Sequence, residues 1–263
     1  MRQLFAFLLL LTTTAPLHAF DDDDIDGVAN AYDLCPNTSF EDTVDENGCP
    51  ENQHYWGKVT MTLGSNINYD DVTTTDYTFF ANYHYHVWDF SLYSSQQGTL
   101  DSNNNQRQSS GDLYFSTGYE ITNEHLLTKL TVGTKLATGS PEVSTGEDDY
   151  FTTLSFNYLL NQNIALLSSL SYTLTGKSGE TTYANPFGYS FGLGYMINDK
   201  WYSSINYQNS NSIYEDSENY EALSFFNSYN FTDTFFATLN YARGLDELSY
   251  RDSFSLRLGV TFE

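Results

Sequence analysis

A short acidic stretch near the N-terminus has the residue types and the spacing of a calcium-binding loop. Oxygen-bearing side chains recur at alternate positions from Asp22, and Gly27 follows the third of them. Calcium takes oxygen ligands at such positions, and a glycine in the middle permits the sharp turn that brings them together. The alternative interpretation is a solvated acidic run. The predicted ligands are Asp22, Asp24, Asp26, the backbone carbonyl of Val28, Asn30 and Asp33.

Two cysteine motifs follow this loop directly. Cys35 begins the sequence CPNT, and Cys49 lies in the closing sequence VDENGCP. Together with the acidic spacing, these residues resemble a thrombospondin type 3 repeat, which is also the linker of outer membrane protein A-type proteins. The resemblance covers about 30 residues and implies calcium binding and a Cys35–Cys49 disulfide. Asn30 departs from the family, where Asp is more frequent, and so removes one charge.

The first residues have the pattern of a secretory signal peptide. A basic residue, Arg2, precedes the apolar run Leu4–Leu11, and Ala19 is a small residue suited to cleavage. Export agrees with the cysteine content, because the only two cysteines of an exported chain most simply form one disulfide. We therefore expect a signal peptide over residues 1–19 and a calcium repeat over residues 20–52.

The composition excludes some classes of protein. The chain has 34 acidic and 10 basic residues, with a formal net charge of −24, which makes nucleic acid a poor partner. It has 22 Tyr and 19 Phe, but after residue 19 it has no apolar segment long enough for a membrane helix. Abundant aromatic residues without long apolar runs are typical of membrane barrels with aromatic girdles.

From residue 53 onward, the chain repeats segments of about ten residues in which apolar and polar side chains alternate. A period of two places one set of side chains on each face of a sheet. The pattern predicts an all-β fold, a 12-stranded antiparallel transmembrane β-barrel over residues 53–263. The predicted strands are Tyr55–Gly64, Asp76–His86, Trp88–Gln97, Gly111–Ile121, His125–Thr138, Tyr150–Leu160, Asn163–Thr175, Phe187–Ile197, Trp201–Asn209, Asn219–Phe231, Thr234–Arg243 and Ser253–Phe262.

The connections between these segments alternate between short and long. This layout is typical of outer-membrane barrels, which have short periplasmic turns and longer external loops. An even number of strands brings both chain ends to the same side, so we expect the calcium repeat to lie in the periplasm. The predicted long loops are Ser65–Thr75, Gly98–Ser110, Gly139–Asp149, Gly176–Pro186, Ser210–Glu218 and Gly244–Asp252.

Because apolar side chains face lipid, the polar set of each strand should line the lumen. Charges of both signs in the lumen are compatible with a selectivity constriction. They are equally compatible with ion-paired side chains that close a narrow barrel. The expected lumen residues are Lys58, Glu120, Lys129, Lys135 and Arg257, with His84, Asp89 and Tyr114 on the same parity.

The leading functional hypothesis is a porin-like passive channel for small solutes in the bacterial outer membrane. The alternative is a non-conducting anchor, in which the calcium repeat or the external loops bind a partner and support adhesion. An enzyme is not expected, because none of the histidines falls at the external rim on this topology. The acidic external loops are explained by simple solvation or by divalent-ion bridging to lipopolysaccharide. A periplasmic partner of the repeat is a further expectation.

Overall fold

The computed structural model describes residues 27–36, 38, 44–50, 57–70, 73–100, 106–123, 125–141, 144, 146–176, 183–214, 219–246 and 249–262. The chain divides into two compact units, Met1–Tyr55 and Trp56–Glu263. Within the described ranges, no helix is long and apolar enough to cross a membrane.

Strands make up almost all of the second unit. Each is 10–13 residues long, apart from one short strand, β4. The strands are β1 (Lys58–Tyr69), β2 (Thr73–Tyr85), β3 (Trp88–Leu100), β4 (Gln106–Ser110), β5 (Leu113–Thr122), β6 (Leu126–Leu136), β7 (Asp149–Leu159), β8 (Ile164–Leu174), β9 (Phe187–Asn198), β10 (Trp201–Ser210), β11 (Tyr220–Asn230), β12 (Phe235–Gly244) and β13 (Asp252–Phe262).

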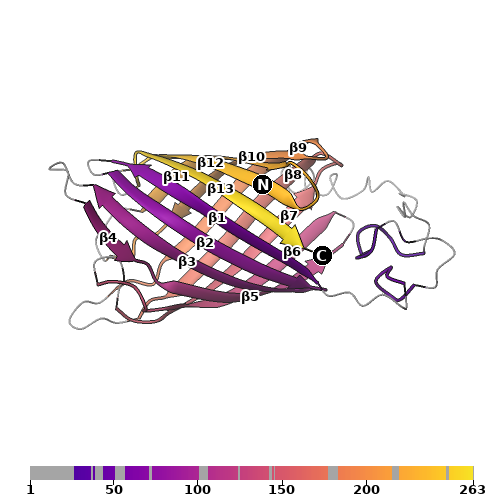
Figure 1. Ribbon diagram of the computed structural model, residues 1–263, viewed down its shortest axis with the longest axis horizontal. Helices are drawn as coiled ribbons and strands as arrows, with labels where there is room; N and C mark the ends of the chain where they lie inside the picture. The colour runs from indigo at the N-terminus through magenta and orange to yellow at the C-terminus, as the bar shows by residue number, and fades with distance from the viewer. Residues whose placement is uncertain are drawn as a thin grey trace, which may run out of the picture. The chain divides into compact units, whose positions relative to one another are not determined.

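Twelve of these strands form a closed antiparallel barrel. Each pairs with its neighbours in sequence, β3 pairs with β5, and β1 pairs with β13 to close the ring. The first and last strands are in register from Val59–Phe262 to Tyr69–Asp252. Figure 1 shows the strands running obliquely around the barrel, with β13 beside β1. Closure leaves these twelve strands with no free edge, which a sheet in lipid requires.

The barrel has two different ends. One end carries the start of β1, the end of β13 and five connections of two to four residues, such as His86–Val87 between β2 and β3. We call it the turn end. The opposite end, which we call the loop end, carries the longer connections, such as the one between β6 and β7, together with the three-residue connection between β1 and β2. His86 has a φ of 52°, which fits a two-residue hairpin turn.

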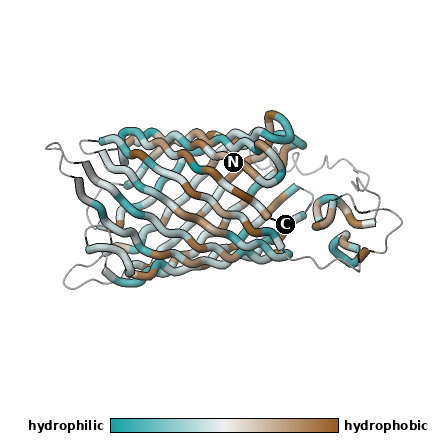
Figure 2. Tube along the Cα trace, in the orientation of Figure 1, coloured by the Kyte–Doolittle hydropathy of each residue, from teal (hydrophilic) through white to brown (hydrophobic). Residues whose placement is uncertain are grey.

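The two faces of the barrel wall differ in polarity. In β9, Phe191 is 57% exposed, and it alternates with Ser190 and Gly192 on the other face. The same alternation appears as brown and pale segments along the strands in Figure 2. The outward set is mostly apolar over the middle of the long strands, so it presents a lipid-compatible surface, and the inward set is mostly polar or small, with some large side chains among it.

Aromatic side chains mark two levels on the outer wall. Near the turn end, the rings of Trp88 and Tyr119 lie 4.8 Å apart, and those of Trp201 and Tyr229 lie 6.3 Å apart. Toward the loop end, Tyr150 is 59% exposed on the same face. Tyr and Trp prefer the membrane interface because their rings combine an apolar body with a polar tip. The two levels therefore delimit the lipid-facing band.

The prediction of twelve barrel strands is confirmed, but the loop end differs from the prediction. The segment predicted as the long loop Ser65–Thr75 is mostly strand, because β1 and β2 continue to Tyr69 and from Thr73. The polar side chains of this extension pair with one another: Asn68 Nδ2 donates to Thr74 Oγ1 at 3.2 Å and to Asp76 Oδ2 at 3.2 Å. Polar residues can extend a strand where there is no lipid to face.

A second difference is β4, which lies inside the predicted loop Gly98–Ser110. It pairs with the end of β3, from Gln96–Ser110 to Leu100–Gln106. This hairpin extends β3 at the loop end, while the barrel itself continues from β3 to β5. Glutamine- and serine-rich residues gave no alternation of apolar side chains, which is why the sequence pattern did not predict this strand.

The N-terminal unit is held together by a disulfide between Cys35 and Cys49, as expected. Thr38 Oγ1 lies 2.7 Å from the carbonyl of Cys35 and 2.9 Å from that of Gly48, and its single proton is shared between these two acceptors. Asp45 Oδ1 accepts from the backbone of Cys49 at 3.1 Å. A disulfide across a loop of this length contributes about 3 kcal/mol in the chain-entropy account. It stabilises a unit too small to bury a substantial core.

Candidate functional site

The lumen of the barrel is the candidate functional site, and strand parity determines which side chains reach it. Met61 and Leu63 of β1 face outward, and so do Leu130 and Val132 of β6. The residues between them face inward. All five expected lumen residues lie on this inward parity: Lys58, Glu120, Lys129, Lys135 and Arg257.

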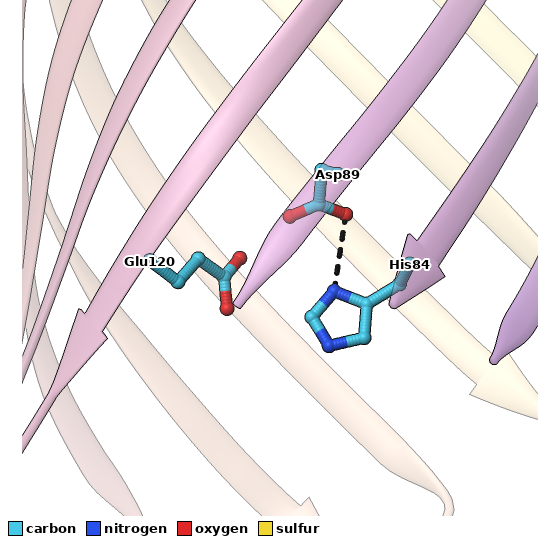
Figure 3. A group of neighbouring side chains, drawn as sticks. All are labelled: His84, Asp89 and Glu120. Atoms are coloured by element: carbon cyan, nitrogen blue, oxygen red, sulfur yellow. Dashed lines mark ion pairs between the residues drawn. The ribbon is translucent and has the colours of Figure 1, made fainter. Parts of the chain in front are cut away.

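A first group of charges lies near the turn end, on β2, β3, β5 and β6. Lys129 Nζ lies 2.9 Å from Glu120 Oε1 and also hydrogen bonds to Asp89 Oδ2. His84 Nδ1 lies 3.3 Å from Asp89 Oδ1. Figure 3 shows His84, Asp89 and Glu120 converging from neighbouring strands. The ammonium thus holds two carboxylates together in a polar network on the lumen wall.

The same group includes three potential metal ligands. One ligand atom from each of His84, Asp89 and Glu120 lies within 4.8 Å of the others. Nitrogen and oxygen donors of this kind suit zinc. However, the Lys129 ammonium already contacts both carboxylates, so a divalent ion must displace it to bind. The wild-type arrangement is therefore better described as an ion-paired cluster.

A second group of charges lies near the loop end. Lys135 Nζ lies 2.6 Å from Asp149 Oδ2 and 3.6 Å from Asp112 Oδ2, and all three residues are buried. The carboxylates also connect the strands to the loops. Asp112 Oδ1 accepts from the backbone of Gly139, and Asp149 Oδ1 accepts from that of Gly176, each at 2.8 Å. Lys135 therefore belongs to a buried structural network.

Asp112 was not predicted as a lumen residue, and Asp149 was predicted to lie in an external loop. Asp149 is directly opposite Lys135 in the β6–β7 register, and Asp112 immediately precedes β5. A signal was present in the sequence, since an acidic residue begins or precedes each strand that flanks β6. Recognising it requires the register, because only the register shows that both carboxylates meet the same lysine.

Arg257 differs from both lysines. It lies midway along β13, and it faces the lumen directly opposite Gly64 of β1 and Thr238 of β12. Its side chain has no hydrogen bond or ion pair with any described residue, and its Nε is buried. Directly opposite and diagonal positions are the ones within reach of a side chain in a sheet. At Arg257 these positions hold only uncharged residues, namely Thr62, Gly64, Asn66, Phe236, Thr238 and Asn240.

Lys58 is the remaining cation of the expected set. It begins β1 at the turn end and pairs in register with His84 of β2. It is exposed, and its position at the rim separates it from Arg257 at mid-height. The expected lumen cations thus occupy different surroundings, and only Lys129 and Lys135 are each held by two carboxylates within the described residues.

Large side chains on the lumen wall lie against glycines of neighbouring strands. A Cβ on Gly259 would lie 2.1 Å from Cζ of Phe236, and a Cβ on Gly194 would lie 2.3 Å from the hydroxyl of Tyr202. These contacts exist only because glycine has no side chain. The same arrangement joins Gly133 with Phe151, Gly118 with Lys129 and Gly64 with Arg257. Each large side chain therefore lies along the wall.

The acidic residues of the loop end are partly structural. Asp246 Oδ1 accepts from the backbone of Ser249 at 2.8 Å, and its Oδ2 accepts from the backbone of Glu221. Asp148 Oδ1 accepts from the backbone of Ala137 at 2.8 Å. These carboxylates close loops, which accounts for part of the acidity that the sequence analysis ascribed to solvation or lipopolysaccharide.

The histidines near the turn end have structural surroundings. The His86 ring packs edge-on against Tyr85 at 4.3 Å, and the His125 ring lies 6.3 Å from that of Tyr158. His84 pairs with Asp89 as described above. The contacts of His86 and His125 fit histidines among aromatic residues at the membrane interface.

The predicted calcium ligands fall partly outside the described residues. Asp22, Asp24 and Asp26 lie outside them, whereas Val28, Asn30 and Asp33 lie within them. Asp33 Oδ1 accepts a hydrogen bond from the backbone of Cys35 at 2.8 Å, which closes a turn before the disulfide. Calcium binding and membership of the thrombospondin type 3 family stay predictions.

Solved structures resemble this chain, although its sequence matches no protein-family model and no curated protein. An outer membrane channel from Pseudomonas putida F1 superposes with a TM-score of 0.64 at 12% identity, over 83% of this chain and 100% of that one. The NanC porin superposes with a TM-score of 0.59 at 13% identity, over 78% of this chain and 99% of that one. At these identities the likeness concerns the fold, and this chain has the fold of an outer-membrane β-barrel.

Proposed function

We propose that this protein is a passive channel for small polar solutes in a bacterial outer membrane. The observation that carries the proposal is the arrangement of the lumen wall, where large side chains lie flat against glycines of adjacent strands. A barrel of about eight strands has an interior that side chains fill, and the diameter grows with strand number. Twelve strands therefore provide additional width. The glycines leave space in which the bulky side chains lie along the wall, so these side chains do not extend across the lumen.

The charged groups of the lumen support the same proposal. Lys129 and Lys135 are drawn to the wall by carboxylates on adjacent strands, so they do not extend across the lumen. This favours the selectivity interpretation of the lumen charges over the plug interpretation, since ion pairs within one wall segment do not bridge opposite walls. The fold shared with two outer-membrane channels is compatible with this role.

The direct test is solute flux through the refolded mature protein in liposomes. We expect liposomes that contain the protein to swell in small sugars at a rate that falls as the sugar becomes larger. Liposomes with an equal amount of heat-denatured protein are the control. Equal swelling in the two preparations, with the barrel shown to be folded, would refute the channel.

A second proposal concerns the N-terminal unit, which we infer binds calcium in the periplasm. It is supported by the acidic spacing of residues 22–33 and by the compact disulfide unit that follows. Calcium would attract the carboxylates of one loop and so reduce their mutual repulsion. A unit of this kind can bind a periplasmic partner. An anchor function therefore stays the alternative to a channel. A calcium-dependent partner together with a silent barrel would favour the anchor.

A further inference from the structure

The lumen has two chemically different walls. One wall, formed by β2, β3, β5, β6 and β7, carries the half-buried Lys129 network and the buried Lys135 network with their carboxylates. On the described lumen face of β8–β13, by contrast, the single charged residue is Arg257. A solute that enters the lumen therefore meets neutralised cations on one wall and an unneutralised cation on the other.

The surroundings of Arg257 form a patch of hydrogen-bonding groups. Among the described residues, neither Asn66 Oδ1 nor Arg257 Nε has a hydrogen-bond partner, and both atoms are buried. Such groups are costly to leave unsatisfied, and because both atoms are buried, contacts to a solute in the lumen fall to the Nη1 and Nη2 atoms of the guanidinium and to the other polar groups around Arg257. We define the Arg257 patch by the uncharged polar residues around the guanidinium: Thr62, Asn66, Thr238, Asn240 and Ser255.

The position of Arg257 also suits recognition. Gly64 lies under the side chain, and a Cβ there would lie 2.4 Å from Cγ of Arg257. The aliphatic stem is therefore held along the wall at mid-height, where every solute must pass. A guanidinium is always charged and has a planar set of donors that matches the two oxygens of a carboxylate.

We propose that the Arg257 patch is a binding step for small hydroxylated carboxylates on their way through the channel. The guanidinium binds the carboxylate, while the neighbouring amide and hydroxyl groups exchange hydrogen bonds with the solute's hydroxyls. This inference rests on the proposed channel function and names the class of solute. The interaction must be modest, because a solute has to leave the site as well as enter it.

The test compares gluconate with glucose, which have similar size but differ in the carboxylate. Binding is measured by titration calorimetry on the detergent-folded protein, with no membrane transport required. We expect gluconate to bind the wild type and glucose to bind much more weakly. In Arg257→Gln we expect the affinity for gluconate to fall about tenfold or more, as expected for the loss of a hydrogen bond to a charged group.

Arg251→Gln is the matched control, because Arg251 is an exposed arginine near the loop end, 4.0 Å from Asp70. It should bind gluconate as the wild type does. Equal affinity for gluconate in Arg257→Gln and the wild type would overturn the inference, as would equal affinity for glucose and gluconate in the wild type.

Bilayer recordings separate this inference from the channel proposal. With an open channel, gluconate should reduce or interrupt the chloride current of the wild type but not that of Arg257→Gln. A silent, folded barrel that still binds gluconate through Arg257 would contradict the channel and retain the site. A conducting barrel that does not distinguish gluconate from glucose would support the channel proposal and refute the binding site at Arg257.

Discussion

The ring of Phe236 lies flat over Gly259 on the lumen wall, and a Cβ on Gly259 would come 2.1 Å from Cζ of that ring. The nearest atoms around this position all belong to the same side chain. An added methyl group would therefore displace the ring and leave the backbone in place. Phe236 can lie against the wall because Gly259, on the neighbouring strand, has no side chain.

The first prediction follows from this contact. We expect Gly259→Ala to turn Phe236 into the lumen and to lower single-channel conductance. Gly98→Ala is the control, since the nearest atom there would be at an ordinary 3.5 Å. The double variant Gly259→Ala with Phe236→Ala should recover the conductance. An unchanged conductance in Gly259→Ala would show that the ring does not limit the path.

The second prediction concerns the buried network around Lys135. Lys135→Met leaves Asp112 and Asp149 buried without their cation, and breaking such a pair costs about 3–5 kcal/mol. We expect a loss of that order in the free energy of unfolding, measured by urea titration of the barrel folded in lipid. Lys200→Met, in an exposed turn, is the control and should change stability little. A loss no larger than that of the control would contradict the structural role of Lys135.

The third prediction concerns the group near the turn end. In Lys129→Ala the carboxylates of Asp89 and Glu120 lose their ion pair with the ammonium, and His84 stays beside them. We expect micromolar zinc to reduce the current of this variant and to leave the wild type unaffected. Adding His84→Ala to the variant should remove the effect. Inhibition of the wild type to the same degree would show that Lys129 does not compete with the metal.

The fourth prediction concerns the N-terminal unit. Calcium should protect residues 22–50 from protease, with an affinity on the order of 10⁻⁴ to 10⁻³ M, as for extracellular modules. Asp24→Ala should abolish the protection while the barrel stays folded. Reduction of the Cys35–Cys49 disulfide should increase cleavage even with calcium, because the unit then lacks its cross-link. Equal protection with calcium and with chelator would refute the metal assignment.

The barrel strands could be predicted from the sequence because the alternation that marks each strand is a property of neighbouring residues. A strand that separates lipid from a lumen must alternate, and the segment from Phe187 to Tyr195 does so at every position. The loop end was less predictable, since a strand above the lipid has no apolar face to reveal it. For this reason β4 and the outer half of β1 were missed.

The candidate site was only partly predictable. Parity places Lys129, Lys135 and Arg257 in the lumen alike, and nothing local distinguishes them. The carboxylate partners of the two lysines come from strands that only the register brings together, such as Asp149 opposite Lys135. The glycine contacts depend on the register in the same way, because Phe236 and Gly259 are 23 positions apart in sequence (259 − 236) and face each other across β12 and β13.

The central claim is an open lumen, and the most direct measurement is single-channel conductance of the refolded mature protein in a planar bilayer. The fold of the same preparation is verified by its heat-dependent mobility on a denaturing gel. We predict stable current steps, which decrease in Gly259→Ala. The absence of steps from a verified folded barrel would contradict the account and would favour an anchor whose partners bind the N-terminal unit or the loops.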